Sequence, residues 1–153
     1  PSGPPEVASK EEASSAFASG ESFLEGFARE DYNSTDYAKP GTLTFTVPLD
    51  EGESPLWLYA WCAATTEVLD QNFQNIKLKF MLDGVEVPLD QLANEDLENN
   101  GQQCRLYYTA LSNWPAGEHH LSITATFTKP INDGFSDYEA GDYTLDYNVF
   151  VRP

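Results

Sequence analysis

The sequence predicts an all-β fold, an antiparallel β-sandwich of about seven strands that follows a flexible N-terminal tether. Short runs alternate apolar and polar residues with a period of two, as expected for strands with one buried face. Turn-forming residues separate these runs at intervals of roughly 8–15 residues, and no segment has the pattern of a long helix. A small β-barrel is the alternative architecture.

The N-terminal segment has the composition of a tether. Residues 1–22 are rich in Pro, Ser, Ala, Gly and Glu and show no apolar period, which is typical of flexible linkers. Residues 23–28, FLEGFA, form a short apolar segment that we expect to dock on the domain. We therefore divide the chain into an acidic tether, residues 1–31, and a β-sandwich domain, residues 32–153. Such a tether suits a lipoprotein, anchored through a segment that would precede Pro1.

The first half of the domain contains four predicted strands. Residues 42–49 alternate apolar residues with threonine, which indicates a half-buried strand. Residues 56–66, LWLYAWCAATT, are apolar on both faces and predict a second, buried strand. Residues 76–82 alternate again, and Asp83-Gly84 predicts a tight hairpin turn into the fourth strand at 85–89.

The second half contains three predicted strands separated by polar connections. The strands are residues 103–111, 121–127 and 143–151, and the connections are the acidic segment 90–102, the Trp114-Pro115-Ala116-Gly117 turn and the loop 129–142. Because the connections 67–75, 90–102 and 129–142 hold most of the acids of the domain, the topology predicts a negative pole at one end of the sandwich, able to attract cations or a basic partner.

Composition excludes several classes of function. The 153 residues include 25 acidic and 8 basic side chains, so the formal net charge is −17. This charge opposes binding to phosphate backbones and to anionic lipid, and a nucleic-acid partner is therefore not expected. No run approaches the roughly 20 apolar residues that span a bilayer, so no transmembrane segment is expected either. Hydrophobic residues at 41% are sufficient to form a core.

The two cysteines bear on the compartment. Cys62 and Cys104 each lie in a strand-like run, and no CxxC motif or Cys/His cluster suggests a metal or redox site. Two isolated cysteines in such a chain predict one structural disulfide in an exported, extracellular or cell-surface protein. Two buried free thiols are the alternative.

One segment carries a family resemblance. WPAGEHHLSITATF, residues 114–127, is similar to bacterial extracellular immunoglobulin-like domains, in which a Gly-x-His-x-Leu turn opens a long alternating strand. The acidic loop with Asp133-Gly134 and the closing strand ending YNVFV are similar too, so the resemblance covers roughly residues 41–153. It implies an immunoglobulin-like sandwich and an exported protein, and it implies no activity.

The sequence also departs from the antibody-type pattern. That pattern places a tryptophan on the third strand, whereas residues 76–82 contain none, and Trp57 and Trp61 flank Cys62 on the second strand instead. Cys104 lies on the strand before the Gly-x-His-x-Leu turn. A bridge to Cys62 would therefore join neighbouring strands of one sheet rather than the two sheets.

No catalytic constellation emerges, and we expect no enzyme and no catalytic residue. His119 and His120 are adjacent, so on a strand they point to opposite faces and cannot form one site. No HExxH, GxSxG, P-loop or GxGxxG motif is present. The alternative is an enzyme with a pair of carboxylates across a cleft, as in glycoside hydrolases. Because the chain has 25 acidic residues, some such pair always exists, and its presence is little evidence of catalysis.

The aromatic second strand suggests a ligand platform. If Cys62 points into the core, strand parity places Trp57, Tyr59 and Trp61 together on the other face, and Tyr107 could extend the row. Such a flat ladder would stack on sugar rings, as in a carbohydrate-binding module. The alternative is that the docking segment or a loop covers this face as a second small core.

The last long loop has calcium-like chemistry. It supplies five oxygen-bearing side chains, Asn132, Asp133, Asp137, Glu139 and Asp142. Calcium takes about 6–8 oxygen ligands, although the spacing does not match an EF-hand. We therefore predict no cofactor other than calcium at this loop, with a solvated acidic loop as the alternative.

Together these features predict a non-catalytic, exported binding or structural module of a cell surface or envelope. Its expected partner is a protein or a glycan. A self-assembling fibre subunit is a variant, in which residues 23–49 would pair with a neighbouring chain's sheet.

Overall fold

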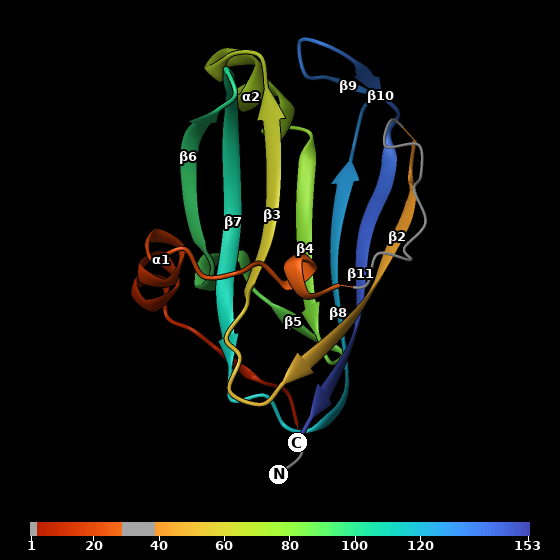
Figure 1. The fold of residues 1–153 in the computed structure, drawn as a ribbon. Coiled ribbons are helices and arrows are strands. Elements are labelled where there is room, and N and C mark those ends of the chain that lie inside the picture. The colour runs from red at the N-terminus through yellow and green to blue at the C-terminus, as the bar shows by residue number, and fades with distance from the viewer. Residues whose placement is uncertain (1–2, 29–38) are drawn as a thin grey trace.

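Two β-sheets packed face to face form the body of the molecule (Figure 1). The computed structural model describes residues 3–28 and 39–153. The larger sheet has the order β2-β11-β8-β4-β5. In the smaller sheet β7 is the central strand: β3 pairs with one of its edges, and β1 and β6 each pair with the other. The larger sheet comprises β2 (Gly41–Asp50), β11 (Gly141–Arg152), β8 (Gly117–Phe127), β4 (Ile76–Leu82) and β5 (Val85–Val87). The smaller comprises β1 (Glu6–Val7), β7 (Gln102–Ser112), β3 (Leu56–Ala63) and β6 (Ala93–Asn99).

Short elements cap the two sheets. A small hairpin of β9 (Ile131–Asn132) and β10 (Asp137–Tyr138) lies at the same end of the molecule as the helix α2 (Thr66–Phe73), while β5 and the C-terminal end of β11 lie at the other end (Figure 1). The remaining elements are α1 (Lys10–Ala18) and the 3-10 turns η1 (Leu24–Phe27) and η2 (Leu89–Gln91). No helix among the described residues is long and apolar enough to cross a membrane.

The β-rich fold is confirmed, but the predicted number of strands is wrong. Each of the seven predicted segments contains a strand, although those at 56–66 and 85–89 end early, and the described residues contain eleven strands in total. The additional strands are β1, β6, β9 and β10. Strand β6 lies within the acidic segment 90–102 that was predicted as a connection. It pairs with β7 through its backbone, while its side chains are mostly exposed and show no apolar alternation.

The prediction of a purely antiparallel sandwich is also wrong at one pair. Strands β2 and β11 are parallel, in register from Tyr143 opposite Gly41 to Arg152 opposite Asp50. The pairing partners are about 100 residues apart, so no turn between them reveals their direction. This pairing within the chain also places residues 41–50 in the chain's own sheet, and the variant in which they pair with a neighbouring chain is not supported.

The described part of the predicted tether is ordered against the domain. Residues 6–7 pair with β7, and α1 begins at a capping box in which the Ser9 hydroxyl accepts from the Glu12 amide and the Glu12 carboxylate accepts from the Ser9 amide. Ala13 is fully buried, and the Phe17 ring packs 5.0 Å from that of Tyr108. The prediction of a flexible segment is therefore wrong here. The predicted boundary between residues 31 and 32 lies outside the described residues.

The predicted second strand is shorter than expected. It ends at Ala63, and the Thr65 hydroxyl accepts from the Val68 amide at 3.2 Å to cap α2. The helix continues to Phe73 and covers one end of the sandwich. Threonine in this position satisfies an amide that a helix otherwise leaves unpaired, which explains why the chain leaves the sheet here.

The main core lies between the sheets and contains the inward face of β3. Trp57 is fully buried there, with its ring edge-on to Phe80 at 5.0 Å. Cys62 lies on the opposite face, with the outer cluster of Leu56, Cys104, Leu106 and Tyr108 that α1 covers. The premise that Cys62 points into the main core is thus wrong, because both faces of this strand are apolar and parity alone does not choose between them.

The disulfide between Cys62 and Cys104 is confirmed. The two residues are directly opposite in the antiparallel pair of β3 and β7, so the bridge joins neighbouring strands of one sheet. A stable disulfide indicates an oxidising environment.

The turn η1 packs across the side of the sandwich between β2 and β3. Leu24 is fully buried in the main core. The neighbouring Glu25 carboxylate accepts a hydrogen bond from the Tyr147 hydroxyl of β11. Burial raises the pKa of Glu25, although the bond from Tyr147 opposes this effect.

We expect Glu25 to make stability depend on pH. A carboxyl whose pKa is raised on folding stabilises the folded state below its unfolded pKa, and this contribution is lost as the pH rises through the folded value. Glu25→Gln keeps an acceptor for Tyr147 without the charge, so its Tm should exceed that of the wild type by a few degrees at pH 8 and match it at pH 4. Thermal unfolding monitored by circular dichroism measures this difference. Glu86→Gln, at an exposed position, serves as the control, and an equal gain at both pH values would contradict the prediction.

Candidate binding site at one end of the sandwich

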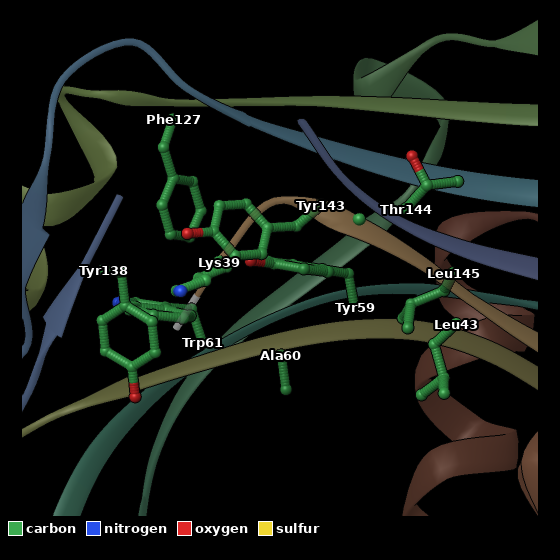
Figure 2. Close-up of a pocket in the computed structure, with 11 residues that line it drawn as sticks. Lys39, Leu43, Tyr59, Ala60, Trp61, Phe127, Tyr138, Tyr143, Thr144 and Leu145 are labelled. Carbon is green, nitrogen blue, oxygen red and sulfur yellow. The ribbon is translucent and has the colours of Figure 1, made fainter. Parts of the chain in front are cut away.

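An aromatic pocket opens between the sheets close to α2 and the β9–β10 hairpin. Its volume is about 260 Å³. Five aromatic side chains from four strands contribute to its wall, namely Tyr59, Trp61, Phe127, Tyr138 and Tyr143 (Figure 2). Leu43 and Leu145 also line the pocket, and so does Lys39, which contributes a positive charge.

A buried hydrogen-bond network fixes one wall of the pocket. The Trp61 Nε1 donates to the Asn72 side-chain oxygen at 2.9 Å, and the Asn72 amide donates to the Asn132 carbonyl at 3.0 Å. Asn72 is buried, and because its oxygen and its nitrogen are both hydrogen-bonded, it connects α2 to β3 and β9. The Trp61 ring is also held edge-on by Phe127 at 5.2 Å and by Tyr138 at 4.9 Å.

The Tyr59 hydroxyl is a polar group of the pocket that can bind a ligand. Tyr59 is 9% exposed, and no hydrogen-bond partner for its hydroxyl occurs within residues 3–28 and 39–153. Burial raises the pKa of Tyr59, and the nearby Tyr143 acts in the same direction. The hydroxyl therefore stays protonated and can donate. By contrast, the Tyr143 hydroxyl already donates to the Glu139 carbonyl at 2.7 Å.

The β9–β10 loop beside the pocket is rigidly held. The buried Asp133 carboxylate accepts from the amides of Phe135 and Ser136, both at 2.8 Å, and from the Tyr138 hydroxyl at 3.2 Å. The Ala64 amide donates to the Asp133 carbonyl at 2.8 Å. Gly134 has φ +96°, and a Cβ there would lie 2.5 Å from the Ala64 Cβ. At the tip of this loop the Phe135 side chain is 64% exposed.

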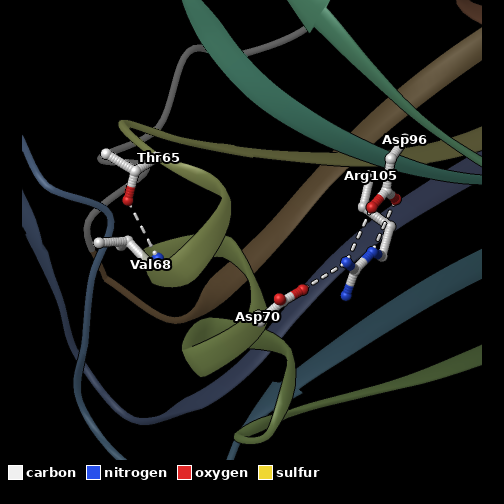
Figure 3. Close-up of polar contacts among 5 residues, drawn as sticks. All are labelled: Thr65, Val68, Asp70, Asp96 and Arg105. Carbon is white, nitrogen blue, oxygen red and sulfur yellow. Dashed lines mark hydrogen bonds and ion pairs between the residues drawn. The ribbon is translucent and has the colours of Figure 1, made fainter.

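Acidic side chains surround this end of the molecule. Exposed acids occur on α2 and on the segment 137–142, namely Glu67, Asp70, Asp137, Glu139 and Asp142. The positive charge of Arg105 is used in two ion pairs, with Asp70 at 2.6 Å and with Asp96 at 2.8 Å (Figure 3). Its hydrogen bonds lower the pKa of Asp96, and its guanidinium lies 5.0 Å from the Phe73 ring centre.

Comparison with known proteins gives only distant likenesses. No family model and no curated protein matches the chain. Among solved structures, PbICP-C in complex with falcipain-2 is similar with a TM-score of 0.44 and 11% identity, over 78% of this chain and 96% of that one. The cysteine protease inhibitor EhICP2 from Entamoeba histolytica gives a TM-score of 0.41 and 10% identity, over 77% and 100%. The Plasmodium falciparum protein Pf12p gives 0.38 and 7%, over 75% and 43%.

The predicted aromatic platform is not a surface ladder. Trp57, Tyr59 and Trp61 do share a face, but that face is turned toward the opposite sheet. Trp57 is fully buried, and Tyr107 is half-buried with its ring 6.0 Å from that of Phe73. Of the four residues, only Tyr59 and Trp61 line the pocket.

The predicted calcium residues are engaged in hydrogen bonds with neighbouring groups. The Asn132 amide donates to Asp137 at 2.8 Å and its oxygen accepts from the Gly134 amide. The Asp142 carboxylate accepts from the Thr126 hydroxyl at 2.6 Å. Within the described ranges no three His, Cys, Asp or Glu side chains are grouped to hold a metal ion. Calcium binding by Asn132, Asp133, Asp137, Glu139 and Asp142 stays a prediction.

The two histidines make separate contacts. His119 is buried, with Nδ1 2.6 Å from the Asp83 carboxylate and Nε2 2.7 Å from the Pro115 carbonyl. His120 is exposed, with Nε2 2.5 Å from Asp146. Each histidine thus has an aspartate as a hydrogen-bond partner, and these contacts hold the start of β8.

The negative pole predicted from the acidic connections needs one correction. The connections 67–75 and 129–142 do lie at the same end (Figure 1). Glu95, in contrast, lies along β6, where it accepts a hydrogen bond from the Tyr108 hydroxyl near α1.

Phe135 was not singled out from the sequence. A lone aromatic residue in an otherwise polar loop is the sequence signal that could have identified it.

Proposed function

We propose that this chain is a non-catalytic, exported binding module with an immunoglobulin-like sandwich, and that it binds a protein at a cell surface or envelope. Its contact surface is the end of the sandwich formed by the β9–β10 loop and α2. The observation that carries this proposal is the exposed Phe135 on a rigidly held loop.

A rigid exposed aromatic side chain is well suited to anchor a protein interface. Aromatic anchors that insert into a partner's pocket supply much of the binding energy at interfaces. Three hydrogen bonds to Asp133 and the close contact of Gly134 with Ala64 hold the loop before any partner arrives. Little conformational entropy is therefore lost on binding, which favours affinity.

The surrounding charge indicates the kind of partner. Exposed acids on α2 and on the segment 137–142 flank the Phe135 loop. They favour a protein with an apolar pocket bordered by lysine or arginine, and they oppose anionic membranes and nucleic acids. Association should weaken as salt rises, because exposed charges are screened within about 8 Å at physiological ionic strength.

The test compares two substitutions at matched exposure. Phe135 and Val85 are both 64% exposed but lie at opposite ends of the molecule. We expect Phe135→Asp to reduce capture of the partner from a cell-envelope extract by about tenfold or more, and Val85→Asp to leave capture unchanged. Quantitative mass spectrometry of proteins retained on the immobilised variants measures this. If the amounts of retained protein are unchanged by Phe135→Asp, or are reduced equally by both variants, the assigned surface is wrong.

A further inference from the structure

We infer that the aromatic pocket is a binding site for a free small aromatic acid, a single planar ring that carries a carboxylate. This site goes beyond the proposed protein-binding surface, because it uses side chains between the sheets rather than the exposed Phe135. Three properties of the pocket carry the inference: its size, its aromatic wall, and the polar groups that remain for a ligand.

The size of the pocket suits one substituted ring. Apolar cavities of about 150 Å³ bind benzene, whereas sites for drug-sized ligands are typically 300–1,000 Å³. At about 260 Å³ this pocket lies between these values. It can hold a ring with a short substituent and is small for an oligosaccharide.

The wall of the pocket favours an aromatic ring. Trp61, Phe127 and Tyr138 contact one another edge-on at 4.9–6.5 Å, and Tyr143 packs 4.4 Å from Phe127. Aromatic pairs prefer such offset and edge-on arrangements, which add about 0.5–1.5 kcal/mol beyond the burial of area. The hydrogen bonds of Asn72 and these ring contacts fix the positions of the rings before a ligand binds. The pocket therefore presents a preformed surface to a planar ligand.

The available polar groups favour a carboxylate on that ring. The Tyr59 hydroxyl is protonated and has no hydrogen-bond partner among the described residues, so it can donate to a ligand in the pocket. Tyr59 and Lys39 both line the pocket (Figure 2). The hydroxyl of Tyr143 and the indole nitrogen of Trp61 are already used. An anion in the pocket would accept a hydrogen bond from the Tyr59 hydroxyl and compensate the positive charge of Lys39.

Titration of the full chain with four probes tests the assignment. Benzoate and 4-hydroxyphenylacetate should shift the Trp61 indole N–H resonance in ¹H–¹⁵N spectra, with saturable binding at millimolar concentration or tighter. Cyclohexanecarboxylate, which is not planar, should bind at least fivefold more weakly. N-acetyl-phenylalaninamide represents the side chain of a peptide, and tighter binding of this probe than of the acids would overturn the choice of a free acid.

Variants then connect binding to the pocket. We expect Tyr59→Phe to weaken benzoate binding about fivefold, since a net hydrogen bond is worth about 1 kcal/mol, and Lys39→Met to weaken benzoate more than benzamide. Tyr107→Phe is the matched control outside the pocket, and Phe135→Asp should leave benzoate binding unchanged. Circular dichroism verifies that each variant is folded. Equal affinities for benzoate in wild type and Tyr59→Phe, or no saturable shift at 10 mM probe, would overturn the inference.

Discussion

Replacement of Trp57 by alanine should lower the free energy of unfolding by about 3–5 kcal/mol, the range typical of a large aromatic removed from a core. Trp57 is 0% exposed and packs edge-on against Phe80 in the contact between the sheets. The cavity left behind would lie where β3 faces β4, and a chain of this size cannot fill it without moving a sheet. Urea denaturation monitored by far-UV circular dichroism measures the loss.

Phe135→Ala is the control for this loss, because Phe135 is also aromatic but 64% exposed. Its free energy of unfolding should stay within about 0.5 kcal/mol of the wild type. Trp57→Phe is a second comparison. The Trp57 Nε1 has no hydrogen-bond partner in the part of the chain that the structure describes, so phenylalanine loses volume without losing a bond there and should be less destabilising than alanine. A stable Trp57→Ala chain would mean that this side chain is not part of the core.

Removal of the disulfide should destabilise the fold by about 4 kcal/mol, as the loop-closure relation gives for a bridge across 42 residues. The two cysteines face each other on β3 and β7, so the native strands stay paired through their backbones when the bridge is absent. The effect therefore falls on the unfolded chain, which becomes free to expand. The double variant Cys62→Ala/Cys104→Ala should unfold at a lower urea midpoint, and dithiothreitol should shift the wild type in the same direction.

The variant itself provides the control for reduction, because dithiothreitol has no bond to break in the Cys62→Ala/Cys104→Ala chain. Its urea midpoint should be the same with and without reductant. Identical midpoints for oxidised wild type and the double variant would contradict the predicted contribution of the bridge.

Strand positions were predictable from sequence because period-two alternation follows directly from the geometry of a strand. The core faces of β2, β4 and β8 follow from Phe45, Phe80 and Ile123, which alternate with polar neighbours. Strand β3 is different. Leu56 and Trp57 are adjacent and both fully buried, on opposite faces, so the sequence contains no polar face that would orient the strand.

Other features depend on contacts that no local pattern encodes. The helix α1 does have a signal, the capping box of Ser9 and Glu12 followed by Ala13 and Phe17 on one side, but its low hydrophobicity concealed it beside a tether-like composition. The pocket has no such signal. Tyr59 and Tyr143 are 84 positions apart, and only the packing of β3 against β11 brings their side chains together.

The parallel pairing of β2 with β11 has a consequence for the order of folding. Within the described residues β2 pairs with β11, and β11 is also the strand that joins β2 to β8. During synthesis, residues 41–50 emerge about 100 residues before their partner, and at 5–20 residues per second they wait on the order of 5–20 s. The smaller sheet and its disulfide can form during that interval, since β3, β6 and β7 are complete by Ser112. The larger sheet closes when β11 pairs with both β2 and β8. Until then, the edge of β2 that β11 will cover is open to aggregation.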